Sequence, residues 1–194
     1  MIDLPDTPGP ASVDWNLIDF GGNLTPPLGG AEQRINRLGN RWAATITMPP
    51  MSSEEARLWV ARLTRGVREG VRFKLRQLGV DVGAPGSPTV NGGGQAGTAL
   101  NITGATPRYA LRVGQCLNIV TGGRRYLYRA YSPVVLGSSG NGTVGIEPPL
   151  RAQPANGDSV IIGAPVIEGR IEPLQWSVPE NRLTVLQFTI TERA

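Results

Sequence analysis

The sequence contains no histidine and a single cysteine, Cys116. Without histidine there can be no histidine-based zinc site, no Ser-His-Asp or Cys-His catalytic arrangement, and no use of the commonest general base. One cysteine cannot form an intramolecular disulfide or a cysteine-based metal cluster. We therefore expect neither a bound metal nor a cofactor.

Lysine and long apolar runs are also scarce. Lys74 is the only lysine among 19 basic residues, which stand against 15 acidic ones and give a net charge of +4. A net charge this small does not point to nucleic-acid binding, which usually concentrates charge in a stripe. No segment approaches roughly 18 consecutive apolar residues, and the first six residues lack the basic and apolar parts of a signal peptide. The sequence predicts a soluble protein, made in the cytosol, with no membrane insertion.

Turn-forming residues are abundant. The 194 residues include 26 Gly and 17 Pro, with 40% hydrophobic and 18% charged residues. This composition is typical of a globular, β-rich fold with short strands, in one large domain or two small ones.

The first 80 residues predict strands and one helix. Strands are expected near residues 15–20 and 41–48, separated by a long loop over residues 21–30. Ser52 as N-cap and Glu55 three positions later form a capping-box pattern, which predicts a helix over about 53–65 that ends at Gly66. Its expected buried stripe, with Trp59 packing the helix onto a sheet, consists of Ala56, Trp59, Val60, Leu63 and Val67.

The middle of the chain differs from the first 80 residues in composition. Residues 81–165 contain few charges, many Gly and Pro, and five short strand patterns, at 98–103, 111–120, 125–131, 143–147 and 158–163. Residues 166–194 return to the earlier composition, with a turn at 179–181 and a last strand carrying Leu186, Phe188 and Ile190 on one face. We therefore predict a discontinuous base domain, 1–80 and 166–194, interrupted by an inserted small β domain.

Residues 71–76 alternate apolar and cationic side chains, which predicts a strand with Arg72, Lys74 and Arg76 on one face. Two interpretations are open. The face is either solvated and protects a sheet edge from aggregation, or it is a contact surface, such as a subunit interface, for an acidic partner or a phosphate backbone.

The stretch GGGQAG, residues 92–97, has the spacing of a dinucleotide-binding loop. That spacing works where a strand ends and a helix begins, but residues 98–104 read as a strand and no acidic residue follows about 20 positions later. We expect a loop that enters a β segment. Carboxylates alone could support glycoside hydrolysis, yet nothing in the sequence pairs Glu147, Asp158, Glu168 or Glu172. The sequence thus predicts no enzyme.

Residues 124–131 interleave arginines with tyrosines, a composition that suits stacking on bases or sugars. Strand alternation places Arg124, Tyr126 and Tyr128 on one face. Tyr126 and Tyr128 therefore belong either to a core face with hydroxyls reaching its rim or to a polymer- or glycan-binding surface. The second option keeps a cell-surface carbohydrate-binding module open as a function.

The organisation as a whole resembles the distal tail proteins of long-tailed, siphovirus-like bacteriophages. The local matches are WAA (42–44), MPPM (48–51), ARLW (56–59), GSPTVNGGGQAG (86–97) and EPPLR (147–151). The resemblance implies a mainly β (α+β) fold: a tail-tube-like β-sandwich with one packed helix, interrupted by a small inserted β-barrel or β-sandwich domain.

The same resemblance implies a structural virion protein at the tail tip, assembled in the host cytoplasm. Such proteins form a homo-hexameric ring that joins the tail tube protein to the tip or hub proteins, with DNA passing only as cargo. In many proteins of that family the inserted domain can resemble a carbohydrate-binding module. This chain departs from that pattern, because all four tryptophans lie outside residues 81–165. The tail-tube and tail-terminator rings share the base fold, and the insertion favours the distal tail protein.

Overall fold

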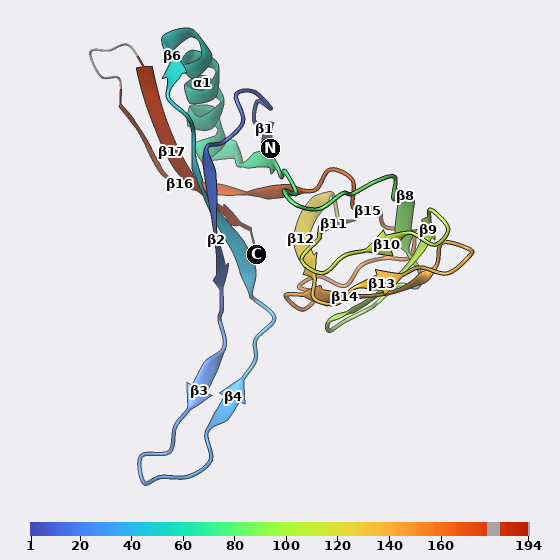
Figure 1. Cartoon of the computed structure of the whole chain (residues 1–194). Coiled ribbons are helices and arrows are strands. Elements are labelled where there is room, and N and C mark those ends of the chain that lie inside the picture. The colour runs from blue at the N-terminus through green and yellow to red at the C-terminus, as the bar shows by residue number, and fades with distance from the viewer. Residues whose placement is uncertain (178–182, 194) are drawn as a thin grey trace.

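The computed structural model describes residues 1–177 and 183–193, so the turn predicted at 179–181 lies outside the described residues. The strands form two main sheets (Figure 1). One sheet is built from the beginning and end of the chain and carries the helix, and we call this part the base domain. The other is built from residues 86–161, and we call it the inserted barrel. The prediction of a mainly β protein with one packed helix is confirmed.

The base domain contains a seven-stranded sheet. Its strands are β1 (Ile2–Asp3), β2 (Ser12–Ile18), β5 (Arg41–Thr47), β6 (Met51–Ser52), β7 (Val71–Lys74), β16 (Val166–Ser177) and β17 (Leu183–Glu192). They lie in the order β1-β7-β16-β17-β5-β2, with β6 attached to β17. All neighbours are antiparallel except β1 and β7, which run parallel. Long-range pairing of both chain ends thus builds one continuous sheet.

Helix α1 (Ser53–Glu69) begins as the sequence predicts. Ser52 accepts a hydrogen bond from the Glu55 amide, and the Glu55 carboxylate accepts one from the Ser52 amide, which completes the capping box. The predicted end at Gly66 is wrong, since the helix continues to Glu69 and stops at Gly70, whose φ of 79° suits only glycine. Val67, predicted on the buried stripe, is 53% exposed.

Gly66 lies inside the helix for a packing reason. A Cβ at this position would stand 2.3 Å from Cγ1 of the buried Val71 and 3.1 Å from Cδ1 of Ile171. Glycine therefore allows the last turns of α1 to approach the sheet closely. Gly66 is thus required for close packing, whereas the positive φ that ends the helix is found at Gly70.

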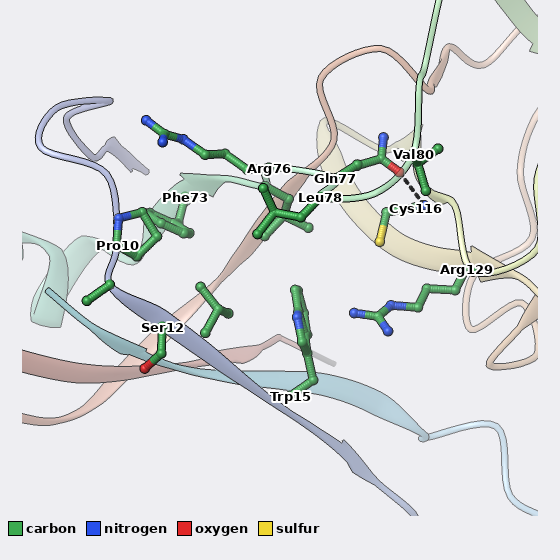
Figure 2. Close-up of a pocket in the computed structure, with 14 residues that line it drawn as sticks. Pro10, Ser12, Trp15, Phe73, Arg76, Gln77, Leu78, Val80, Cys116 and Arg129 are labelled. Atoms are coloured by element: carbon green, nitrogen blue, oxygen red, sulfur yellow. Dashed lines mark hydrogen bonds between the residues drawn. The ribbon is translucent and has the colours of Figure 1, made fainter.

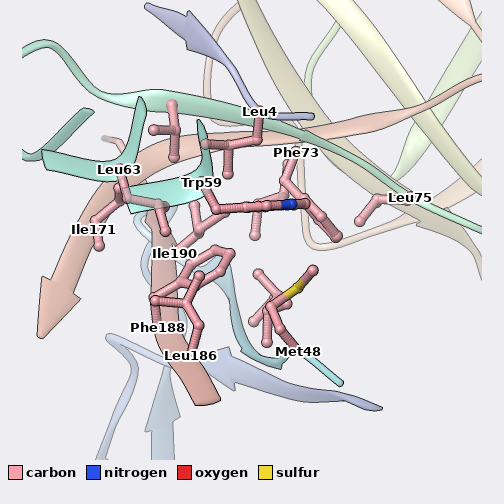
Figure 3. Close-up of a cluster of buried hydrophobic side chains, with 14 of the residues drawn as sticks. Leu4, Met48, Trp59, Leu63, Phe73, Leu75, Ile171, Leu186, Phe188 and Ile190 are labelled. Atoms are coloured by element: carbon pink, nitrogen blue, oxygen red, sulfur yellow. The ribbon is translucent and has the colours of Figure 1, made fainter. Parts of the chain in front are cut away.

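The core of the base domain lies between α1 and the sheet (Figure 3). Trp59 is 1% exposed, and its ring centroid lies 6.2 Å from that of Phe188, while its indole nitrogen donates to the Thr7 carbonyl. On β17, the predicted face of Leu186, Phe188 and Ile190 is fully buried. Trp59 packs the helix onto the sheet as predicted, and side-chain alternation fixes which face of each strand takes part.

The inserted barrel contains a six-stranded sheet in the order β15-β11-β12-β14-β9-β8 and a short separate pair, β10-β13. Its strands are β8 (Gly86–Val90), β9 (Ala99–Ala105), β10 (Ala110–Leu111), β11 (Cys116–Thr121), β12 (Arg124–Ala130), β13 (Val134–Val135), β14 (Gly142–Glu147) and β15 (Val160–Ile161). A bridge between Thr89 and Ser159 joins the first and last strands, and the Val90 amide donates to the Asp158 carbonyl. The sheet thus nearly closes on itself around its own hydrophobic core.

Two connecting segments join the base domain to the barrel. The chain leaves the base sheet after β7 and returns to it at β16, and the predicted boundaries, after residues 80 and 165, fall in these segments. Strand β8, absent from the sequence prediction, lies in the glycine- and proline-rich stretch that leads into the barrel.

A third feature projects from the base domain. Strands β3 (Gly22–Leu24) and β4 (Gln33–Ile35) pair as an antiparallel hairpin, which extends from β2 and β5 far beyond the sheet (Figure 1). We call residues 19–40 the arm. The sequence predicted only a long loop over part of this stretch.

Candidate assembly surfaces

The cationic residues of β7 and its continuation already have partners within the chain. Arg72 faces Glu168 across the β7–β16 pair and binds its carboxylate at 2.6 Å. Lys74 lies 3.4 Å from the Asp6 carboxylate, and Arg76 donates to the Asp6 carbonyl at 3.5 Å. These partners could not be predicted from the sequence, because they come from β16 and from the N-terminal segment, far away along the chain.

These contacts change what the three residues can do. Arg72 is a cross-strand partner of a buried carboxylate, so its first role is in the fold. Lys74 and Arg76 are exposed, and their contact with a neighbouring subunit stays a prediction.

The two candidate tyrosines are placed differently from each other. Tyr128 is 1% exposed inside the core of the barrel, and its hydroxyl accepts a hydrogen bond from the Arg151 amide. Burial raises the pKa of the Tyr128 hydroxyl, against the opposing effect of Arg151. Tyr126 is half-buried beneath the guanidinium of Arg151, which lies 5.2 Å from its ring centroid. Tyr128 therefore offers no ring face to a glycan, and the pair does not form a stacking platform.

The GGGQAG stretch connects β8 to β9, and no helix follows it within the described barrel. The Gln95 side chain holds the turn by donating to the carbonyls of Asn91 and Gly92 and accepting from the Asn101 amide. The stretch enters a β segment, as the sequence predicts, and the strand before it makes it a hairpin connection. It lacks the strand-to-helix geometry that a pyrophosphate needs.

The arm is an exposed hairpin that was predicted only as a loop. From residue 22 to residue 38 every residue is exposed. Three leucine side chains in this stretch are exposed to solvent: Leu24 is 55% exposed, Leu28 at the turn is 97% exposed, and Leu38 is 63% exposed. Single exposed leucines are ordinary on protein surfaces, but a whole projecting hairpin without a buried residue has no core of its own.

The base of the arm is fixed by polar contacts. Asp19 forms an ion pair with Arg34 on the opposite limb and accepts the Gly21 amide, while the Asn40 side chain accepts the Phe20 amide. The Gly21 amide is the main cause that lowers the pKa of Asp19, helped by Asn40 and Arg34. The paired Gly-Gly steps at 21–22 and 29–30 around Pro26-Pro27 were the available sequence signal for a hairpin.

A buried ion pair joins the two domains. Glu192, at the end of β17, is 2% exposed and lies 2.8 Å from the Arg151 guanidinium of the barrel. Its carboxylate also accepts the amides of Trp42 on β5 and Leu127 on β12. Burial raises the pKa of Glu192, opposed by Arg151 and the two amides. One carboxylate thereby ties together two strands of the base sheet and the barrel.

Further contacts extend this junction. Arg129 of β12 lies over two tryptophans of the base sheet, 4.5 Å from the Trp15 ring centroid and 4.8 Å from that of Trp42. Asn118 exchanges two hydrogen bonds with the backbone of Val166, where the chain returns to the base domain. These are the cation–π and amide contacts of a fixed orientation between domains, and we call them, with the Glu192–Arg151 pair, the domain junction.

A cleft of about 540 Å³ opens beside the junction, between β2 and the segment that leads to the barrel (Figure 2). Trp15, Phe73 and Cys116 line it, and the Gln77 side chain accepts the Cys116 amide at its inner wall. Burial raises the pKa of the Cys116 thiol, although nearby Arg129 opposes the shift. The charged residues that line the cleft are Arg76 and Arg129, so its lining is mainly apolar, with the polar Ser12 and Gln77 and two positive charges.

Other common kinds of site have no counterpart in the described parts of the chain. Over residues 1–177 and 183–193, no three acidic or cysteine side chains gather as a metal-ligand set. No helix in these ranges is long and apolar enough to cross a membrane. No protein-family model matches the chain, and no curated protein sequence matches it.

Proposed function

We propose that the protein is a structural virion subunit, which assembles with copies of itself into a ring at the distal end of a phage tail and joins the tail tube to the tail tip. The observation that carries the proposal is the arm, a projecting hairpin that is exposed throughout residues 22–38. A two-stranded hairpin is marginal by itself in water. Its exposed leucines are explained if a neighbouring subunit covers them on assembly.

Unpaired strand edges give further support. Within the described residues, β2 pairs only with β5, and β16 pairs with β7 only over 166–169, so its last eight residues present an open edge. Open edges are sites where a strand of another chain can pair. The two edges lie at different places on the subunit, as a head-to-tail contact requires, and such contacts form a ring when the rotation closes.

The face of the base sheet opposite the helix is suited to a water-filled channel. Asp14, Thr45 and Thr189 lie side by side on it, and the two threonine hydroxyls are hydrogen-bonded to each other at 2.9 Å. Their side chains are exposed or half-buried. The same face also carries charged groups, with Arg72 paired to Glu168 across β7 and β16 and Arg170 opposite Thr191. A hydrated face of this kind fits a lumen that carries DNA only as cargo.

The position in the tail rests on the inserted barrel, since the resemblance to distal tail proteins includes the insertion and tube or terminator rings share only the base fold. The partners in this proposal are the tail tube protein on one side and tip or hub proteins on the other. The proposal assigns the protein no catalytic role and no cofactor. It also leaves out glycan binding, because Tyr128 is buried and Tyr126 is covered by Arg151.

Sedimentation velocity over a concentration series tests the proposal. The wild-type chain is compared with a short-arm variant in which residues 23–34 are replaced by Asn-Gly, which closes the existing Gly22–Ile35 pair with a two-residue turn. We expect assembly of the wild type at high concentration and a monomer for the variant, with equal circular dichroism. Assembly that is unaffected by removal of the arm contradicts the role given to it.

A further inference from the structure

We propose that the tip of the arm, around Leu28, inserts into the cleft between base domain and barrel of a second copy of this chain. The inference rests on the proposed self-assembly and names the two surfaces that meet. One is the segment 24–32, at the end of the arm, and the other is the cleft beside Trp15 and Cys116.

The chain cannot fill its own cleft with its own arm. The arm leaves the base sheet after Ile18, at the far end of β2, whereas the cleft is lined by Ser12, Val13 and Trp15 in the near half of this strand. The tip at Leu28 lies ten residues beyond Ile18, a further distance of about 30 Å at roughly 3.3 Å per residue. Beyond Ile18 the arm continues away from the sheet, and the barrel stands to one side of it (Figure 1). The arm of another copy is therefore the candidate occupant.

The apolar parts of the two surfaces match. The arm tip presents Leu28, 97% exposed, after Pro26-Pro27, which restricts the backbone and so lowers the entropy cost of ordering it. The cleft is lined by half-buried Trp15 and by Phe73 and Leu75, which are largely buried, and its size of about 540 Å³ lies within the range of roughly 300–1,000 Å³ for sites that enclose a ligand. Proline-containing segments commonly dock on aromatic surfaces of this kind.

The charges match as well. Between Phe20 and Gln33 the only charged residue of the arm is Glu32. The charged residues of the cleft are both positive, with Arg76 exposed at its rim and Arg129 held over the two tryptophans. The negative charge of Glu32 would thus approach a site of positive potential, which favours this register and disfavours docking of a basic segment.

Docking of this kind joins two different surfaces of the same chain. Repeated in one direction, it gives a head-to-tail assembly that can close into a ring, and exchanged between two copies, it gives a two-fold dimer. The first limb of the arm, from Asp19 to Gly29, covers about 30 Å at roughly 3.3 Å per residue, which is enough to reach into a neighbouring subunit of this size.

A charge-swap series tests the contact. Glu32→Arg and Arg76→Glu are each expected to raise the concentration for half-assembly by roughly tenfold or more, and the double variant is expected to restore most of the loss. Arg37→Glu, a change of the other unpaired charge on the arm, is the matched control and should leave assembly unchanged. Circular dichroism checks that each variant folds.

Cys116 lines the cleft and is only 7% exposed, so it gives a second readout for an arm tip that inserts deeply. In Leu28→Cys, oxidation with diamide should join the arm cysteine of one copy to Cys116 of the next, as two thiols lose two electrons and two protons to diamide and form a disulfide. Head-to-tail linkage gives a ladder above the dimer on a non-reducing gel. Leu28→Cys/Cys116→Ser removes the cleft thiol and should give no product larger than a dimer.

The outcomes separate this inference from the proposed function. Wild-type rings combined with a silent charge swap and no ladder overturn arm docking in the cleft and leave the ring in place. A wild type that remains monomeric at every concentration overturns the proposed function and this inference together. Doubly linked dimers through Cys116 support the docking site and contradict a ring.

Discussion

The arm and the domain junction show two opposite ways of placing side chains. At the junction, Glu192 is 2% exposed and receives hydrogen bonds from both domains, so that the base sheet and the barrel are held in one orientation. In the arm, residues 22–38 are all exposed and Leu28 contacts little but solvent. The first region completes its interactions within the chain, whereas the tip of the second leaves the Leu28 side chain 97% exposed.

The two regions are therefore expected to affect different properties, the junction the stability of the monomer and the arm the contacts between subunits. A buried ion pair that loses one partner leaves an uncompensated charge, which acts on the stability of the monomer. An exposed hairpin contributes little to that stability, so changes there should act on contacts between molecules. Mutations in the two regions are therefore expected to separate folding from assembly.

The largest effect on folding is expected at the junction. Arg151→Met removes the cation that faces Glu192 and should lower the free energy of unfolding by about 3–5 kcal/mol, because a buried carboxylate is left unpaired. Arg151→Met/Glu192→Gln should recover much of this loss, since no buried charge remains. Urea unfolding followed by circular dichroism measures both. A loss below about 1 kcal/mol for the single variant contradicts the role of the pair.

The contact between helix and sheet gives the next effect. Gly66→Ala places a Cβ 2.3 Å from Cγ1 of Val71, so overpacking should cost about 1–3 kcal/mol despite the better helix propensity of alanine. The control is Gly22→Ala on the arm, where a new Cβ meets nothing within 4 Å. Equal stability of the two variants in thermal unfolding would show that the helix does not need this close approach.

A smaller effect is expected at the start of the helix. Ser52→Ala removes the side chain that accepts the Glu55 amide and should cost about 1 kcal/mol. Ser52→Thr keeps a hydroxyl at the N-cap and should retain most of the stability. The same urea titration distinguishes the two, and a Thr variant as unstable as the Ala variant argues against the capping box.

The smallest effect on folding is expected in the arm. Leu28→Ser should change the free energy of unfolding by less than about 0.5 kcal/mol, because the side chain is 97% exposed. The same variant should weaken self-assembly, measured by sedimentation velocity. A variant that loses stability but assembles normally would contradict the assignment of the arm to assembly rather than to folding.

Local signals in the sequence were sufficient for part of this structure. The capping box depends on residues three apart, and the buried face of β17 follows from alternation, so both could be read directly. The end of the helix could not, because the packing of Gly66 against Val71 and Ile171 is set by the folded sheet.

The candidate surfaces were harder to predict for the same reason. Trp42 and Glu192 are 150 positions apart, and the acid that pairs with Arg72 lies 96 positions away. Only the sheet topology brings these groups together. The sequence therefore could not predict the acidic partners of the cationic strand or the contacts of the domain junction. The arm was missed because its short β3–β4 pair has no buried face, and hydrophobic periodicity detects strands by their buried face.

The most direct test of the account is negative-stain electron microscopy of the concentrated wild-type protein. The account predicts ring-shaped particles with six-fold symmetry and a central hole, lost when residues 23–34 are replaced by Asn-Gly. Uniform particles of the 20.6 kDa monomer at the highest concentration, in the wild type as in the short-arm variant, would contradict it.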